Sequence, residues 1–157
     1  MISASHATSD DISVLVDLYR DLEKEMIGLH SMWPLADGLP EPVDEAFREA
    51  IDDPDSVVIL GSVFDYPFGF LLGRVEELLP QAGGEQVGSI RLVFVEEDAR
   101  QVSVGEVMRD LALEHFREMG ITKFDAHVLP GHRLAKNFFE AGGFSARSII
   151  MHHDDVD

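Results

Sequence analysis

One stretch, residues 92 to 119, constrains the fold of this chain more than any other. It begins with the apolar run Leu92-Val93-Phe94-Val95, whose length and β-branched content are typical of a buried strand. Polar residues 96 to 98 follow, and from Val104 onward apolar residues recur at helical spacing. Gly120 can then cap the helix in a left-handed conformation. The stretch predicts a strand, a turn and a helix, in that order.

The turn before this helix is a predicted anion site. The first amide groups of a helix lack acceptors and lie at the positive end of the helix dipole, so residues 100 to 105 would offer N–H groups to a phosphate. Ser103 and Gly105 are small, which lets a ligand approach the backbone closely. Glu106 lies in the same turn, and its carboxylate would repel a bound phosphate unless it points outward.

The segment from Val95 to Gly105 resembles the signature of the GNAT N-acetyltransferase superfamily, in which a valine-ended strand leads into Arg/Gln-x-x-Gly-x-Gly/Ala at a helix start. The match falls on Arg100, Ser103 and Gly105, with Ser103 standing where the family usually has glycine. A second segment, Ala135 to Phe144, resembles the family's later Ala-x-x-φ-Tyr-x-x-x-Gly-Phe motif. The two segments occur in the family's order, separated by a helix and a strand.

The resemblance implies an α/β (α+β) fold, with a mixed, mostly antiparallel, six- to seven-stranded sheet and helices on both faces. It implies acetyl-CoA as cosubstrate, with its pyrophosphate on the amides of residues 100 to 105. It also implies that a backbone amide around residues 93 to 95 polarises the thioester. The implied cofactor-binding residues are Val93, Phe94, Val95, Arg100, Gln101, Val102, Ser103, Val104, Gly105, Asn137 and Phe139.

The remaining elements fit the same layout over a single domain of residues 1–157. Periodicity and turn residues predict strands at residues 2–6, 56–64, 68–77, 87–95, 123–128 and 145–151. The 56–64 and 68–77 strands should form an antiparallel hairpin. Helices are expected from the caps at residues 8–10 to about Met26, from Pro42 to Ile51, and at residues 133–141, with a loop that has room for one helical turn at residues 27–42.

Composition sets limits on the function. At 157 residues and 45% apolar content, the chain is long and hydrophobic enough to fold unaided. The absence of cysteine excludes disulfides, thiolate zinc sites and a cysteine nucleophile. No apolar stretch approaches the roughly 20 residues that cross a bilayer, and no leader segment is recognisable. We expect a soluble, cytoplasmic protein without a membrane partner.

The net charge also limits the partners. With 30 acidic against 12 basic residues, the chain carries a formal charge of −18, which argues against binding to nucleic acid or anionic membranes. The same charge favours a cationic or amine-bearing substrate. The alternative is that the acidic residues only solvate the surface.

Direct acetyl transfer to an amine needs a proton acceptor and a proton donor but no protein nucleophile. Glu96 follows the central strand and can act as base through water, or it can be a solvated turn residue. At the usual position of the acidic tyrosine stands Phe139, which has no proton to give. His132 can replace it as acid, or it can be a histidine that only precedes a helix.

An acceptor pocket is expected between the first helix and the loop at residues 27–42. Its candidate substrate residues are Tyr19, His30 and Trp33, for which ordinary packing is the alternative. No metal site is predicted, because His152-His153-Asp154-Asp155 are adjacent residues with poor chelate geometry. Arg91 and Glu76 lie on neighbouring predicted strands and can pair across them.

Together these features predict an enzyme that moves acetyl from acetyl-CoA to an amine of a small molecule or peptide by direct transfer. The alternative is a catalytically degenerate GNAT-like module that binds an acyl-CoA or a protein. A homodimer is also conceivable, because the apolar residues Ile149, Ile150 and Met151 can pair or exchange with a neighbouring copy, or can form an interior strand.

Overall fold

The computed structural model describes residues 1–155, apart from the side chain of residue 35, and contains one five-stranded sheet. The strands lie in the order β1-β2-β3-β4-β5. The first four pair antiparallel, and the last pairs parallel to β4. Their bounds are Ile2–His6 for β1, Ser56–Val63 for β2, Tyr66–Glu77 for β3, Gln86–Val95 for β4 and Phe124–Ala126 for β5.

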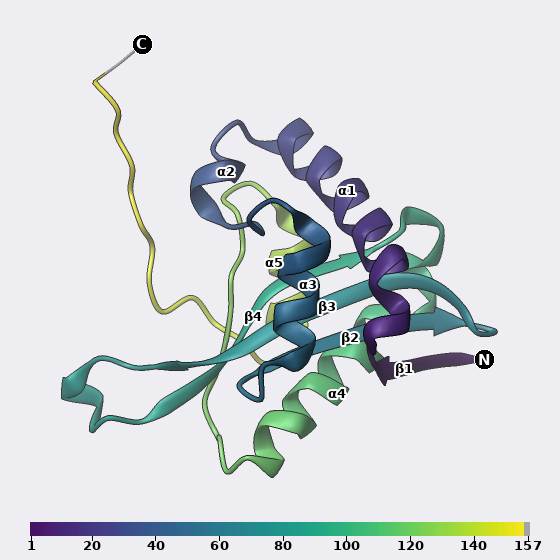
Figure 1. Ribbon diagram of the computed structural model, residues 1–157. Helices are drawn as coiled ribbons and strands as arrows, with labels where there is room; N and C mark the ends of the chain where they lie inside the picture. Colours follow the sequence, from purple (N-terminus) through teal and green to yellow (C-terminus); the bar gives the residue numbers. More distant parts are fainter. Residues whose placement is uncertain (156–157) are drawn as a thin grey trace.

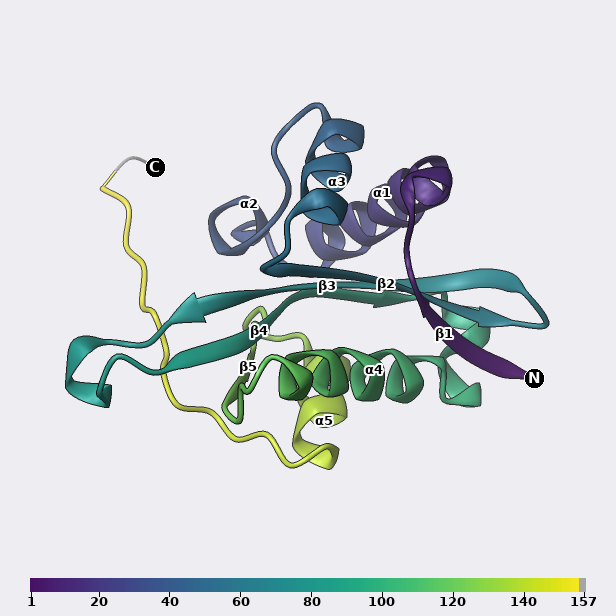
Figure 2. The same ribbon diagram turned by 60° about the horizontal axis from the view of Figure 1, so that its bottom comes forward.

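Helices cover both faces of this sheet (Figure 1). One face carries α1, α2 and α3, and the opposite face carries α4 and α5, as the turned view in Figure 2 makes plain. The α-helices are α1 (Ile12–Leu29), α2 (Trp33–Ala36), α3 (Val43–Asp52), α4 (Val104–Glu118) and α5 (Arg133–Ala141). The short 3-10 helices are η1 (Ser9–Asp11), η2 (Pro80–Ala82) and η3 (Glu97–Val102).

The apolar spacing of the helices explains this arrangement. On α1, Leu15, Leu18 and Leu22 recur every three or four residues and pack into the core on one face of the sheet. On α4, Met108, Ala112 and Phe116 do the same on the other face. Helix α4 packs closely on the sheet backbone. A Cβ atom at Gly88 would lie only 2.5 Å from the Phe116 ring.

Most predicted elements are confirmed, with small shifts at their ends. The hairpin turn falls at residues 64–65, and Val63 pairs with Tyr66. Helix α1 runs to Leu29 instead of ending near Met26, and the predicted helical turn in the following loop is α2. Thr8 forms the expected cap, accepting from the Asp10 amide while its own amide donates to Asp11.

The prediction of six to seven strands is wrong, since the sheet has five. The missing element is the strand expected at residues 145–151, where the structure has no secondary structure and every side chain is exposed. A β-strand is stable only when a neighbour accepts its backbone hydrogen bonds, and this segment lies outside the sheet. The β5 strand is also shorter than predicted. In the described residues, no helix combines the length and hydropathy that crossing a membrane requires.

Candidate functional site

Strand β4 is paired along one edge apart from a bulge at Arg91, and only partly paired on the other. Against β3 it pairs from Gln86 to Val95, whereas β5 pairs only with Gly88 to Ile90. The last contact on that side is the bond from the His127 amide to the Ile90 carbonyl, at 3.0 Å. Beyond it, among the described residues, β4 pairs no further with β5, and we call the unpaired β4 edge at residues 92–95 the splay.

A bulge at Arg91 decides which backbone groups face the splay. Before it, the Gly88 amide and the Ile90 carbonyl bond toward the β5 side. After it, the register shifts by one residue, and the Glu96 amide donates to Phe68 of β3 at 2.8 Å. Because antiparallel hydrogen bonding alternates along a strand, the amides of Val93 and Val95 then point into the splay. These two backbone N–H groups can donate hydrogen bonds to the carbonyl oxygen of a thioester or of an amide.

The amino-terminal end of α4 follows the splay directly, through η3. Ser103 takes a left-handed conformation, with φ of 65°, between η3 and α4. The first bond from α4 back to the turn joins the Val107 amide to the Ser103 carbonyl at 3.3 Å. The amides of Val104, Gly105 and Glu106 precede this bond and have no acceptor one turn back within α4. The predicted anion site stays a prediction, in which these amides would be the donors.

The side chains around this turn differ in exposure. Gln101, Val102, Ser103 and Glu106 are exposed, so the Glu106 carboxylate points to solvent, the arrangement that limits repulsion of a phosphate. Val104 and Phe94 are buried, and only their backbone can contact a ligand. A Cβ atom at Gly105 would lie 3.0 Å from the Phe138 ring, so α5 comes close to the helix start.

Arg100 turns inward from the turn toward the end of β4. Its Nε donates to the Val95 carbonyl at 2.8 Å, and its Nη2 lies 2.5 Å from Glu25 Oε1 of α1. The guanidinium also lies over the Phe94 ring, 5.8 Å from its centre. The cation expected to bind pyrophosphate is thus paired with a carboxylate, and it occupies a carbonyl that faces the splay.

His132 belongs to the same group, directly before α5. Burial lowers the pKa of this imidazole, the nearby Glu25 carboxylate opposes that effect, and the Arg100 charge adds to it. A lowered pKa favours the neutral ring, which can accept a proton. The structure therefore brings three groups, His132, Arg100 and the Val95 backbone, to one place.

Glu96 lies just beyond, at the end of β4. Burial raises the pKa of this carboxyl, and the negative charges of Asp21 and Asp98 raise it further. A carboxylate with a raised pKa is a stronger proton acceptor than an ordinary one. Glu96 therefore combines a position beside the splay with the property that a base requires.

The two α5 residues are placed differently. Asn137 is exposed, whereas Phe139 is buried between Phe138 and Phe144, with ring centres 5.1 and 5.3 Å away. The Phe139 ring belongs to the core on the α4 side. Its predicted contact with the cofactor stays a prediction, and the packing alternative accounts for its present position.

Two of the three predicted substrate residues, Tyr19 and Trp33, line a separate hollow of about 440 Å³ between α1, α2 and the loop after α2. Tyr19 and Trp33 form part of its wall, and Glu23 and Asp37 contribute carboxylates. The Tyr19 hydroxyl accepts from the Leu39 amide at 2.9 Å, which ties the loop to α1. Burial raises the pKa of that hydroxyl.

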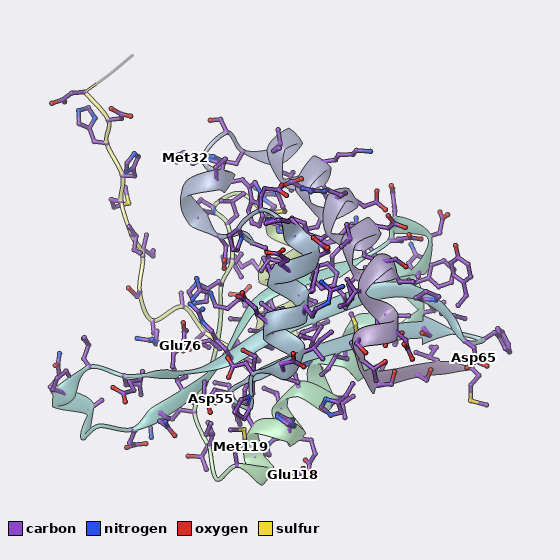
Figure 3. All side chains as sticks on the ribbon, viewed as in Figure 1. Met32, Asp55, Asp65, Glu76, Glu118 and Met119 are labelled. Atoms are coloured by element: carbon purple, nitrogen blue, oxygen red, sulfur yellow. The ribbon has the colours of Figure 1, made fainter. Side chains whose placement is uncertain are left out.

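His30 is not among the residues that line this hollow. Its Nδ1 accepts from the Met32 amide at 3.0 Å, so it organises the start of α2. Met32 is labelled in Figure 3 at the edge of the molecule.

Asp37 links the hollow to the splay. It accepts from Arg91 Nε at 3.1 Å, and Arg91 Nη1 donates to Glu76 Oε2 at 2.7 Å. The cross-strand pair predicted for Arg91 and Glu76 is therefore confirmed. His127 lies near the same charges, and burial lowers the pKa of its ring. Arg91, the residue at the bulge, is thus bonded to Asp37 in the wall of this hollow.

Sequence reasoning missed Glu25, Glu23 and Asp37. They are ordinary acidic residues in a chain with 30 of them, and no local pattern marks them. Glu25 lies 75 positions before Arg100, so only the folded chain joins them. Among the residues that the structure describes, no three histidine, aspartate or glutamate side chains are arranged to hold a metal ion.

Solved structures share this fold at low sequence identity. A transcriptional regulator from Bacillus halodurans C-125 is 22% identical with a TM-score of 0.77, covering 98% of this chain and 100% of that one. An aminoglycoside antibiotic 6'-N-acetyltransferase from Acinetobacter baumannii is 14% identical with a TM-score of 0.75, and each chain is covered completely. A predicted acetyltransferase with acetyl-CoA from Clostridium acetobutylicum is 17% identical with a TM-score of 0.74, over 98% and 96% of the two chains.

Sequence comparison gives a broader assignment. No curated protein sequence matches this chain. The family model described as "Acetyltransferase (GNAT) family" matches residues 15–144, a range that contains β4, the turn, α4 and α5. The chain therefore belongs to the GNAT acetyltransferase family.

Proposed function

We propose that this protein transfers acetyl from acetyl-CoA directly to the amine of a small molecule or peptide. The observation that carries the proposal is the splay, where the amides of Val93 and Val95 point away from β3 on an edge that β5 leaves unpaired, near the amides that begin α4. A thioester can lie along the first set while a pyrophosphate lies on the second. Acetyl transfer is the activity of the family, and one structural neighbour is described with acetyl-CoA.

The chemistry requires few protein groups. The amine nitrogen attacks the thioester carbonyl carbon, and the negative charge that develops on the carbonyl oxygen is stabilised by a backbone amide of residues 93 to 95. Glu96, directly or through water, takes a proton from the attacking nitrogen, a role that its raised pKa favours. The C–S bond then breaks, and the thiolate takes up a proton.

His132 is assigned to that second proton transfer. Its position beside Arg100 and Glu25 places it next to the splay. Because its pKa is lowered and Glu96 takes the proton of the amine, the ring must first gain a proton from solvent before it can protonate the thiolate. Phe139 has no proton to give. The α5 position that usually carries a tyrosine in this family therefore takes no part in this proton transfer.

The acceptor is proposed to enter from the hollow beside Tyr19 and Trp33. The carboxylates of Glu23 and Asp37 in its wall are each paired with an arginine, Arg20 and Arg91, so the attraction for a cationic molecule comes mainly from the overall charge of −18. One structural neighbour is an aminoglycoside antibiotic 6'-N-acetyltransferase from Acinetobacter baumannii, and another was solved in complex with the bisubstrate analog CoA-S-monomethyl-acetylneamine. We therefore propose a molecule with more than one positively charged amine as acceptor.

Calorimetric titration with acetyl-CoA tests the cofactor site. We expect micromolar binding by the natural protein and its loss in Ser103→Glu, which puts a carboxylate at the exposed start of α4 without needing a new backbone conformation. The matched control is Met119→Glu at the other end of α4, exposed and labelled in Figure 3. Circular dichroism of both variants establishes that they fold.

A second assay separates an enzyme from a binding module. Release of free thiol is followed while a panel of diamines and triamines is supplied with acetyl-CoA. Turnover that falls in Glu96→Gln supports the assigned base. Binding without turnover of any amine supports the alternative, a GNAT-like module that holds an acyl-CoA, which the Arg100–Glu25 pair and Phe139 favour. Absence of binding overturns both proposals.

A further inference from the structure

An amine that enters as an ammonium ion loses two protons before it becomes an amide. An alkylamine has a pKa close to that of lysine, about 10.4, so at neutral pH it arrives protonated and has no lone pair for attack. The first proton must leave before the nitrogen attacks the thioester, and the second leaves as the N–C bond forms. Glu96 accepts the second proton in the proposed reaction. The first proton needs an acceptor of its own, on the side from which the amine enters.

His127 lies where β5 stops pairing with β4, at the start of the splay. Its amide donates to the Ile90 carbonyl at 3.0 Å. Phe124 and Ala126 on β5 pack into the core on the α4 side. Alternation along the strand therefore directs Asp125 and His127 to the opposite face, the one that carries α1, α2 and α3 (Figure 2). This is the face of the acceptor hollow, and the His127 side chain is exposed there.

The position of the thioester brings the reacting nitrogen between two titratable side chains. A strand rises about 3.3 Å per residue, so the Val93 amide lies roughly 10 Å from Ile90 on one side and from Glu96 on the other. A bound amine and an imidazole that extends from position 127 together span the first of these distances. The amine therefore has His127 at the start of the splay and Glu96 at its end.

The charges around the imidazole suit a ring that is protonated only transiently. Burial, and then the charge of Arg91, lowers the pKa of His127, so the ring is neutral at neutral pH and can accept a proton. The carboxylates of Asp37, Glu76 and Asp125 oppose that effect and stabilise the imidazolium once it forms. Among the described residues, no hydrogen bond or ion pair occupies the ring of His127. Its nitrogens are therefore available to a ligand.

We propose that His127, directly or through one water, removes the first proton from the ammonium group of the acceptor, an inference that rests on the proposed acetyl transfer. One N–H bond of the ammonium breaks, its electron pair stays on nitrogen, and the proton goes to a ring nitrogen of His127. The free amine then attacks the thioester, and Glu96 takes the second proton. The imidazolium returns its proton to solvent, which restores the neutral ring for the next acceptor.

The pH dependence of acetyl transfer to one linear diamine tests this role. In His127→Gln, the amine must lose its first proton in solution before it can react. We expect kcat/KM of this variant to be reduced roughly 100-fold at neutral pH. The value should rise with pH and equal that of the natural protein near about pH 10, where the amine arrives neutral. A ring that only supports the fold would cause the same reduction at every pH.

Two controls accompany the variant. Acetyl-CoA should bind to His127→Gln as tightly as to the natural protein in calorimetry, because the replaced side chain lies on the acceptor face. His152→Gln, exposed in the carboxy-terminal segment, is the matched histidine control and should keep the natural pH profile.

The possible failures are distinguishable. A reduction that does not depend on pH, or no reduction at all, overturns the role of His127 and leaves the proposed acetyl transfer in place. A natural protein that transfers acetyl to no amine overturns the proposed function itself, and the role of His127 with it, before any variant is measured.

Discussion

The two edges of β4 are built from one strand and have opposite properties. Toward β3 the pairing runs from Gln86 to Val95, interrupted at the bulge of Arg91, and Leu92 and Phe94 on it belong to the buried core. Toward β5 it stops at Ile90, and the backbone donors beyond it have no β5 partner among the described residues. The first edge holds the sheet together. The second provides polar backbone groups, and no side chain has to become ordered before these groups can bind a ligand.

This difference shows how a single strand can serve stability and binding at once. The paired edge fixes the position of every backbone atom of β4, including the atoms on the unpaired edge. The amides of Val93 and Val95 are therefore preorganised before any ligand arrives. A change on the β3 side should affect folding, and a change on the splay side should affect binding.

The largest expected effect lies on the paired side. Phe70 on β3 is fully buried and packs edge-on against Phe47, with ring centres 5.7 Å apart. We expect Phe70→Ala to lower the free energy of unfolding by about 3–5 kcal/mol, measured by urea denaturation. Val102→Ala beside the splay, where the side chain is 41% exposed, should stay within about 0.5 kcal/mol. Equal losses for the two variants would remove the contrast between the edges.

The next effect concerns amide hydrogen exchange along β4. Without ligand, the amides of Val93 and Val95 should exchange faster than those of Phe94 and Glu96, which bond toward β3. With acetyl-CoA at about 100 times its Kd, exchange at Val93 and Val95 should slow by roughly 100-fold, measured by NMR. Slow exchange at all four amides before acetyl-CoA is added would mean that the splay is closed.

A smaller effect is expected from the carboxylate that holds Arg100. Glu25→Gln removes the charge that competes with a phosphate for the guanidinium, so acetyl-CoA should bind roughly threefold to tenfold more tightly in calorimetry. Glu23→Gln is the matched control, because Glu23 is on the same helix and pairs with Arg20 instead. Weaker binding by Glu25→Gln would show that the carboxylate positions Arg100 for the ligand and does not compete with it.

The smallest effect is on the pH dependence of stability. Burial lowers the pKa of His132 in the folded protein. As the pH falls below about 6.5, the ordinary pKa of histidine, the unfolded chain therefore binds the proton first. This histidine therefore contributes a loss of stability as the pH decreases through that range, and none well above it. His132→Gln should flatten the decline between pH 7.5 and 5.5 in urea denaturation. The decline should not vanish, because the pKa values of His6 and His127 are lowered too.

Much of the fold follows from local sequence, and the splay does not. Helical spacing identifies α4, and the pairing of Arg91 with Glu76 follows from their neighbouring strands. The strand predicted at residues 145–151 has the right composition, but composition cannot tell whether a neighbouring edge is available. The carboxylates of Glu25 and Asp37 reach the site through contacts between distant segments, which no local pattern reveals.

The bulge at Arg91 has a consequence for how this site can vary. The groups that face the splay belong to the main chain, so replacing Val93 or Val95 by another residue keeps them in place. Removing one residue at position 91 would rotate the following strand by half a repeat and direct the same amides toward β3. The site therefore depends on the number of residues in β4 more than on their identities, and a single deletion should abolish what most substitutions leave intact.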